Sequence, residues 1–185
     1  MAQCATLLMD LQFDFLSPSG ARMPVDQADA SRVIEVANAV LAGRLASGSL
    51  PVLVVNEFPK SARIGNLFRR GAAVLGTPGA NLDPRLTSRP EVRSFSKSSP
   101  SAFSNPDLEP FLKTSAIRKL YVIGVFAEGC VRATAIEGVR RGFQVVVPLD
   151  AIGTNSEIKR SFAKWAMCRA GVKLIPSLPA IANAA

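Results

Sequence analysis

Three reactive side chains each follow an apolar segment of the chain. Asp10 follows the run at 5–9, Lys97 follows the segment at 92–96, and Cys130 lies shortly after the run at 119–125. A cysteine that attacks a carbonyl needs a base for its proton and a positive charge that holds the thiolate. An aspartate and a lysine can supply these, so the three residue types predict acyl transfer without histidine.

Each residue also has an ordinary structural explanation. An aspartate after a strand often caps a turn, a lysine is usually solvated, and most buried cysteines only pack. We interpret Cys4 and Cys168 as such packing residues. Cys130 differs because it follows Gly129 at a strand-turn-helix junction, where a helix dipole lowers a thiol pKa from about 8.5 toward neutrality. Free N–H groups at this helix start could also form an oxyanion hole.

Apolar segments that predict strands alternate with helical patterns along the chain. The expected strands lie at 5–9, 50–55, 92–96, 119–125, 143–149 and 172–175. The expected helices lie at 27–45, 106–115 with Asn105 as N-cap, 128–141 and 156–170. Parallel strands need crossover helices and are covered on both faces. The pattern therefore predicts an α/β fold, a three-layer α/β/α domain with six parallel strands, whose ligands bind at the carboxyl edge of the sheet.

The chain of 185 residues fits one domain over 1–185, with a long excursion at about 59–90. This segment is rich in Gly, Pro, Ser and Arg, and such excursions often act as lids or contact partners. Arg63, Arg69 and Arg70 could hold a substrate carboxylate with their forked guanidinium groups. A plain surface role for each of them stays open.

Composition excludes several kinds of site. The absence of histidine removes Ser-His and Cys-His pairs and every imidazole metal site. Three cysteines are too few for a Cys4 zinc site and are odd in number, which favours reduced thiols in the cytoplasm. The apolar runs are far shorter than the roughly 20 residues that span a bilayer, so no membrane partner is expected.

The charge balance is 22 basic minus 14 acidic residues, or +8. This charge permits nucleic-acid binding, but the basic residues are scattered, and one Tyr and one Trp offer little stacking surface. We therefore expect no nucleic-acid partner. Binding driven by charge alone remains the weakest alternative, and it would vanish at moderate salt.

Several sequence blocks together resemble a known family. They are Asp10–Phe15 (DLQFDF), Lys97–Phe103 (KSSPSAF), Gly124–Val131 (GVFAEGCV), Arg140–Phe143 (RRGF) and Asp150–Ala151. In this order, from residue 5 to residue 174, the chain resembles the isochorismatase-like cysteine hydrolases. That group includes nicotinamidases, N-carbamoylsarcosine amidase and ureidoacrylate amidohydrolase.

The resemblance implies a Rossmann-like sheet in the order 3-2-1-4-5-6 and a role for each block residue. Asp10 is the implied general base, Lys97 its charge partner and Cys130 the nucleophile. A cis peptide is implied between Val125 and Phe126, with the N–H groups of Phe126 and Cys130 facing the oxyanion. We expect Phe15, Phe103 and Phe126 to contact a small-molecule substrate. The family is usually oligomeric, which predicts a homo-oligomer, a dimer or a tetramer.

Two departures from the family pattern matter. Nicotinamidase-like members hold a metal with histidines after the second strand, where this chain has Asn56 to Pro59, so we expect neither a metal nor another cofactor. Phe126 stands where cysteine-dependent members often have a small residue, and its aromatic ring somewhat resembles the isochorismatases at this position. Those enzymes have glycine at the position of Cys130, which makes vinyl-ether hydrolysis a poor fit.

Two hypotheses of different classes follow. The first is a metal-free cysteine hydrolase of a small amide or carbamoyl compound that works through a thioester. The alternative is a non-catalytic ligand-binding or interaction protein on the same fold, suggested by Phe126 and by the arginine-rich segment.

Overall fold

One parallel sheet organises the molecule, which we describe from a computed structural model covering residues 3–45, 48–87 and 90–179. The strands are β1 (Cys4–Met9), β2 (Leu50–Asn56), β3 (Arg93–Lys97), β4 (Lys119–Val125), β5 (Gln144–Pro148), β6 (Ile152–Gly153) and β7 (Lys173–Ile175). Their order is β3-β2-β1-β4-β5-β7, and β6 pairs with β4. The predicted order is confirmed, with β7 as the sixth expected strand. The additional β6 has two residues, too few to leave an apolar pattern.

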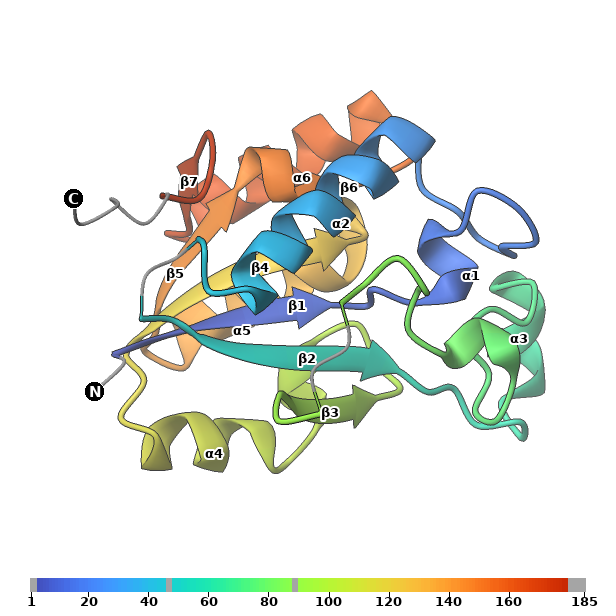
Figure 1. Cartoon of the computed structure of the whole chain (residues 1–185), viewed down its shortest axis with the longest axis horizontal. Coiled ribbons are helices and arrows are strands. Elements are labelled where there is room, and N and C mark those ends of the chain that lie inside the picture. Colours follow the sequence, from blue (N-terminus) through green and yellow to red (C-terminus); the bar gives the residue numbers. More distant parts are fainter. Residues whose placement is uncertain (1–2, 46–47, 88–89, 180–185) are drawn as a thin grey trace.

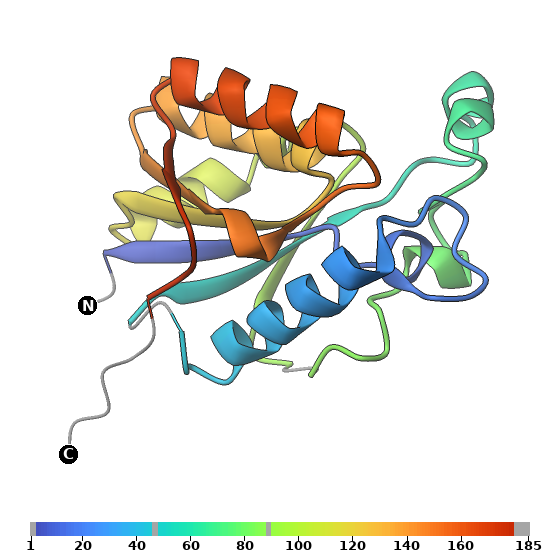
Figure 2. The ribbon, with the colours of Figure 1, turned by 90° about the horizontal axis from the view of Figure 1, so that it is seen from above.

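Helices and short turns connect the strands on both faces. The helices are α1 (Phe13–Leu16), α2 (Gln27–Leu41), α3 (Arg63–Phe68), α4 (Leu108–Thr114), α5 (Arg132–Arg140) and α6 (Glu157–Arg169). The turns are η1 (Pro78–Ala80), η2 (Ala102–Ser104), η3 (Ala127–Val131) and η4 (Leu149–Ala151). Figure 2 shows α2 on one side of the sheet and α6 on the other. Among the described residues, no helix is both long and apolar enough to cross a membrane.

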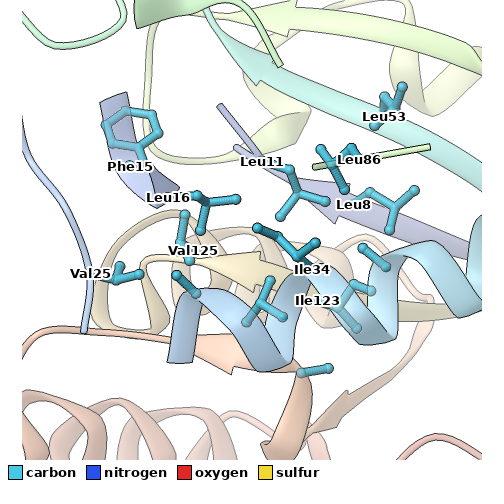
Figure 3. Packing of buried hydrophobic residues seen from close by; sticks show 14 of the residues in the cluster. Leu8, Leu11, Phe15, Leu16, Val25, Ile34, Leu53, Leu86, Ile123 and Val125 are labelled. Atoms are coloured by element: carbon cyan, nitrogen blue, oxygen red, sulfur yellow. The ribbon is translucent and has the colours of Figure 1, made fainter. Parts of the chain in front are cut away.

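The alternation of side chains along β1 divides the core into two halves. Leu8 packs with Ile34 of α2 in the cluster drawn in Figure 3. Leu7 points the other way, into the cluster that holds Leu112 of α4 and Met167 of α6. Because both faces of the strand are buried, β1 is apolar at every position from Ala5 to Met9 except Thr6.

Two helix ends differ from the sequence expectation. Helix α2 ends at Leu41 rather than at 45, because Gly43 adopts a left-handed φ of 71° and turns the chain. Helix α4 begins at Leu108 rather than at 106. The side chain of Asn105 does cap a turn, but it accepts the N–H of Asp107 ahead of the helix (2.9 Å).

The excursion between β2 and β3 lies at the carboxyl edge of the sheet, where Figure 1 shows α1 and α3 beyond the arrowheads of β1 and β2. Gln12 fastens it, since its Nε2 donates to the carbonyl of Ala80 (2.6 Å). Asp14 does the same by accepting the N–H of Ala73 (2.9 Å). The Asp14 carboxylate passes so close to Gly79 that a Cβ there would lie 1.8 Å from its Oδ2. The block around Asp10 therefore holds the loops that frame this edge.

Candidate active site

Four polar side chains meet at the carboxyl edge, one from each of four neighbouring strands. Asp10 directly follows β1, Asn56 ends β2, Lys97 ends β3, and Cys130 lies in η3 after β4. Asp10 has a positive φ of 55°, a conformation that aspartate tolerates better than most residues. The structure therefore brings together Asp10, Lys97 and Cys130 as the strand ends predicted.

The ammonium of Lys97 links the other three side chains. Its Nζ donates to Asp10 Oδ2 (3.0 Å), to Asn56 Oδ1 (2.7 Å) and to Cys130 Sγ (3.3 Å). These bonds use all three protons of the ammonium, and the side chain has no exposed surface. Asn56 Nδ2 lies 3.8 Å from the same sulfur. The lysine is held in one position, between a carboxylate and a thiol.

Cys130 lies in an irregular turn and not in the first turn of a regular helix. The π-type turn η3 is kinked at Gly129 (φ −103°, ψ −107°), and α5 begins only at Arg132. The peptide bond between Val125 and Phe126 is cis, as the resemblance implied. The kink separates Cys130 from the regular helix and weakens the argument from a helix dipole.

The expected low pKa of the Cys130 thiol is wrong. Burial, followed by the charge of Asp10, raises this pKa from 9.0 to about 12, and Lys97 offsets only part of the rise. Burial also raises the pKa of Asp10, although Lys97 and the hydrogen bonds to Cys130 and Asn56 oppose the shift. The free site therefore keeps the proton on sulfur.

One oxygen of Asp10 is free to take that proton. Asp10 is buried, its Oδ2 is bound to Lys97, and its Oδ1 has no hydrogen-bond partner of ordinary geometry among the described residues. The thiol of Cys130 interacts with this carboxylate, as do the side chains of Lys97 and Asn56. Sulfur, proton acceptor and cation are thus arranged for a proton transfer that accompanies attack.

A cavity of about 320 Å³ opens above Cys130. Its walls come from α1 and the loop after it, the end of β2, the excursion, the loop after β3, the turn η3 with the residue before it, and the start of α6 with the residues before it. The lining residues are Phe15, Met23, Asn56, Phe58, Arg69, Ser98, Pro100, Phe126, Glu128, Gly129, Cys130, Asn155 and Lys159. This size suits a small molecule.

Comparison with protein-family models identifies the chain. The model described as the isochorismatase domain matches residues 4–177, nearly the whole chain. The protein belongs to the isochorismatase family. The resemblance predicted from the sequence blocks is confirmed.

Curated members of the family extend the comparison. The chain is 33% identical over 159 residues to a probable inactive nicotinamidase of Arabidopsis thaliana, covering 80% of this chain and 79% of that protein. It is 31% identical to a streptothricin hydrolase of Streptomyces noursei over 81% of this chain and 54% of that one. It is 35% identical to an N-carbamoylsarcosine amidase of Arthrobacter over 40% of this chain and 28% of that one.

Solved structures share the fold of this family member. The pyrazinamidase of Pyrococcus horikoshii in complex with zinc superposes with a TM-score of 0.81 at 27% identity, over 94% of this chain and 98% of that one. An isochorismatase-like hydrolase of Alkaliphilus metalliredigens gives a TM-score of 0.82 at 22% identity, over 94% of both chains. The latter likeness concerns the fold alone.

The expected aromatic contacts divide into two groups in this isochorismatase-family protein. Phe15 and Phe126 form part of the cavity wall, their rings edge to face with centroids 5.7 Å apart, so substrate contact stays a prediction for them. The prediction for Phe103 is wrong. Its ring is buried in the core and stacks on Phe143 (5.8 Å), because η2 turns it toward α5 and not toward the cavity.

Sequence reasoning missed Asn56 and misplaced Cys168. Asn56 holds the same kind of position as Asp10 and Lys97, at the end of a strand, so the rule that found them could have found it. Cys168 is exposed rather than buried, because α6 turns Ala163 and Met167 toward the core and leaves the position after Met167 outside. Of the three arginines considered as carboxylate binders, Arg69 lines the cavity, while Arg63 and Arg70 are exposed.

Asn56 and Phe58, at the end of β2 and just beyond it, do not fit the metal that the family pattern places there. Asn56 Oδ1 already accepts from Lys97, and Phe58 supplies an aromatic ring to the cavity wall. Within the described ranges, no group of three or more Asp, Glu or Cys side chains could hold an ion.

Proposed function

We propose that this protein is a cysteine-dependent hydrolase of a small amide or carbamoyl compound. The observation that carries the proposal is the buried Lys97 ammonium, which is bonded at once to Asp10 and to Cys130, and Cys130 lines a small cavity. Amide hydrolysis needs a nucleophile, a proton carrier and charge control within reach of one carbonyl. These groups supply all three.

In the first half of the reaction, the Cys130 sulfur attacks the amide carbonyl while its proton passes to Asp10. A C–S bond forms, and the negative oxygen is held by the backbone N–H groups of Phe126 and Cys130. Asp10 then gives its proton to the leaving nitrogen, the C–N bond breaks, and a thioester remains. Lys97 stays protonated and offsets the charge that moves between Asp10 and sulfur.

In the second half, water attacks the thioester. Asp10 accepts a proton from the water, and the C–S bond breaks as the acid forms. The proton returns to sulfur, which restores the protonated thiol favoured in the free site. Amide and water are consumed and acid and amine are released, so the site ends in its starting state.

The test incubates the protein with a panel of small primary amides and carbamoyl compounds. Hydrolysis is measured as the release of ammonia. We expect Cys130→Ala to lose activity by at least about a thousandfold on any compound that the protein hydrolyses. Cys168→Ala removes an exposed thiol on α6 and serves as the matched control with full activity. Retained activity in Cys130→Ala contradicts the mechanism.

A second candidate function is binding of a small ligand without turnover. The observation in its favour is the placement of the Cys130 sulfur beside the Asp10 carboxylate, where burial and the Asp10 charge raise the thiol pKa and leave little thiolate in the free site. One curated relative is also described as probably inactive. This candidate predicts that ligands stabilise the protein and leave it unchanged after incubation, with no acid product by mass spectrometry.

Two further proposals concern the setting of the protein. The described free thiols Cys4, Cys130 and Cys168 suit a reducing compartment, which supports a cytoplasmic location. Exposed apolar side chains on α3 and α6 support assembly with further copies of the chain. Chemical labelling of thiols in intact cells tests the first of these proposals.

A further inference from the structure

Arg69 is a cation on the cavity wall without an ionic partner among the described residues. It follows α3, and its guanidinium lies over the ring of Phe58 with Cζ 3.7 Å from the ring centroid. Nη2 donates to Asn66 Oδ1 (3.0 Å), whereas the buried Nε has no partner. A buried donor that is left without a partner destabilises the protein. The guanidinium therefore offers an open hydrogen bond at the edge of the cavity.

The other charged groups of the wall already have partners. Glu128 accepts the hydroxyl proton of Thr154 at Oε2 (2.7 Å), and its Oε1 lies 3.7 Å from Lys159 Nζ. Lys159 also contacts Asn155 Oδ1 (3.5 Å). The lining residues thus include two cations, Arg69 and Lys159, and one anion, Glu128, and the unmatched positive charge belongs to Arg69.

We infer that the substrate carries a carboxylate, which Arg69 binds while its amide or carbamoyl group reaches Cys130. The inference rests on the proposed function and adds the class of substrate. Arginine presents its N–H groups as a planar fork that matches a carboxylate, and the Phe58 ring packs against that fork. Burial lowers the pKa of Arg69, the direction expected for a cation with no anion beside it.

Gly65 offers a way to move the guanidinium without removing it. A Cβ at this position would lie 2.8 Å from Nη2 and 3.1 Å from Nη1 of Arg69, so alanine must displace the fork. Gly65 lies inside α3, where alanine favours the helix over glycine. Gly65→Ala should therefore weaken ligand binding by displacing the guanidinium, while the helix stays intact. A measurement of stability would reveal damage to the helix, if that were the cause of weaker binding instead.

The experiment compares two ligand series on the Cys130→Ala protein, which binds without turnover. The series are the monoamides succinamate and glutaramate and the neutral amides butyramide and valeramide, with affinity measured by calorimetry. We expect the carboxylated series to bind more tightly. Arg69→Gln should weaken its binding by roughly 10- to 100-fold and leave the neutral series unchanged. Gly65→Ala should reduce the same preference, and Arg63→Gln, which removes an exposed charge of α3, should not.

The outcomes separate this inference from the proposed function. Equal affinity for both series, no binding of either, or a preference that survives Arg69→Gln overturns the inference. Turnover on the protein with Cys130 intact is then measured for the same compounds. Carboxylate binding through Arg69 without Cys130-dependent hydrolysis supports the inference and contradicts the proposed function. Hydrolysis of both series at equal rates contradicts only the inference.

Discussion

The Cys130 thiol is surrounded by groups that act on its proton in opposite directions. Lys97 donates a hydrogen bond to the sulfur and favours the thiolate. The Asp10 charge and burial disfavour it, and together they prevail. A protonated thiol resists oxidation and random alkylation, because the thiolate is the reactive form. We expect the substrate carbonyl to trigger the proton transfer to Asp10.

Asp10→Asn should separate thiol acidity from turnover. The substitution removes the negative charge that raises the Cys130 pKa, so this pKa should fall below about 12, while hydrolysis is lost with the proton acceptor. Ultraviolet absorbance of the thiolate during a pH titration measures the first effect, and ammonia release measures the second. Cys130→Ala supplies the baseline that contains only the other two thiols. An unchanged or higher thiol pKa in Asp10→Asn would show that Asp10 is not the opposing charge.

The sequence predicted the positions of these residues better than their acidity. Asp10, Lys97 and Cys130 were found because parallel strands bring their carboxyl ends to one edge. The pKa of Cys130 depends on how deeply several elements bury the sulfur, and no residue spacing reports that burial. Asn56 was missed because an amide is not itself a nucleophile or a base, although it contacts both Lys97 and Cys130.

At the scale of elements, Asp29 joins α2 to the segment between β6 and α6. Its Oδ2 accepts the N–H of Thr154 (3.0 Å) and pairs with Arg160, and its Oδ1 pairs with Arg32. Thr154 in turn donates to Glu128 on the cavity wall. Burial alone would raise the pKa of Asp29, but the hydrogen bonds from Thr154, Arg160 and Arg32 together lower it.

Asp29→Asn should destabilise the protein at neutral pH by about 1–3 kcal/mol, since it removes a buried, charged acceptor. A carboxyl whose folded pKa is lowered stabilises the fold above its unfolded pKa of about 3.9 and stops doing so as the pH falls through the folded value. The difference between the two proteins should therefore shrink on acidification. Urea unfolding between about pH 7 and pH 3 measures it. If the difference in the free energy of unfolding between the two proteins stays constant with pH, the charge of Asp29 is not the cause of the destabilisation.

The sequence predicted helix ends correctly where a residue next to the helix end fixes it. Ser156 accepts the N–H of Lys159 and begins α6 where expected, and Gly142 has the positive φ expected after a helix. The kink at Gly129 was not predicted, because the turn η3 depends on its packing against β4 and α6. The same holds for Phe103, whose apolar ring fits a cavity wall or a core equally well until η2 is placed.

At the scale of the whole molecule, the helices α3 and α6 expose large apolar side chains to solvent. Ile158, Phe162 and Trp165 lie on one face of α6, with exposed fractions of 84%, 52% and 57%. The rings of Phe162 and Trp165 are 5.9 Å apart. From the sequence, such spacing equally predicts a face turned to the core, and only the packing of α6 through Ala163 and Met167 shows that this face is outside.

This face of α6 is the surface on which we expect two copies of the chain to pair. A second copy would cover a contiguous apolar stripe, which monomers seldom expose. Light scattering on the eluting protein should give a multiple of the single-chain mass. The double variant Ile158→Glu and Trp165→Glu should reduce the mass toward that of one chain, because charges cannot be buried unpaired in the interface.

The matched variant Ile64→Glu and Leu67→Glu changes the exposed residues of α3 instead. If only the α3 variant dissociates the assembly, α3 is the interface, and a single-chain mass for the unaltered protein contradicts assembly altogether.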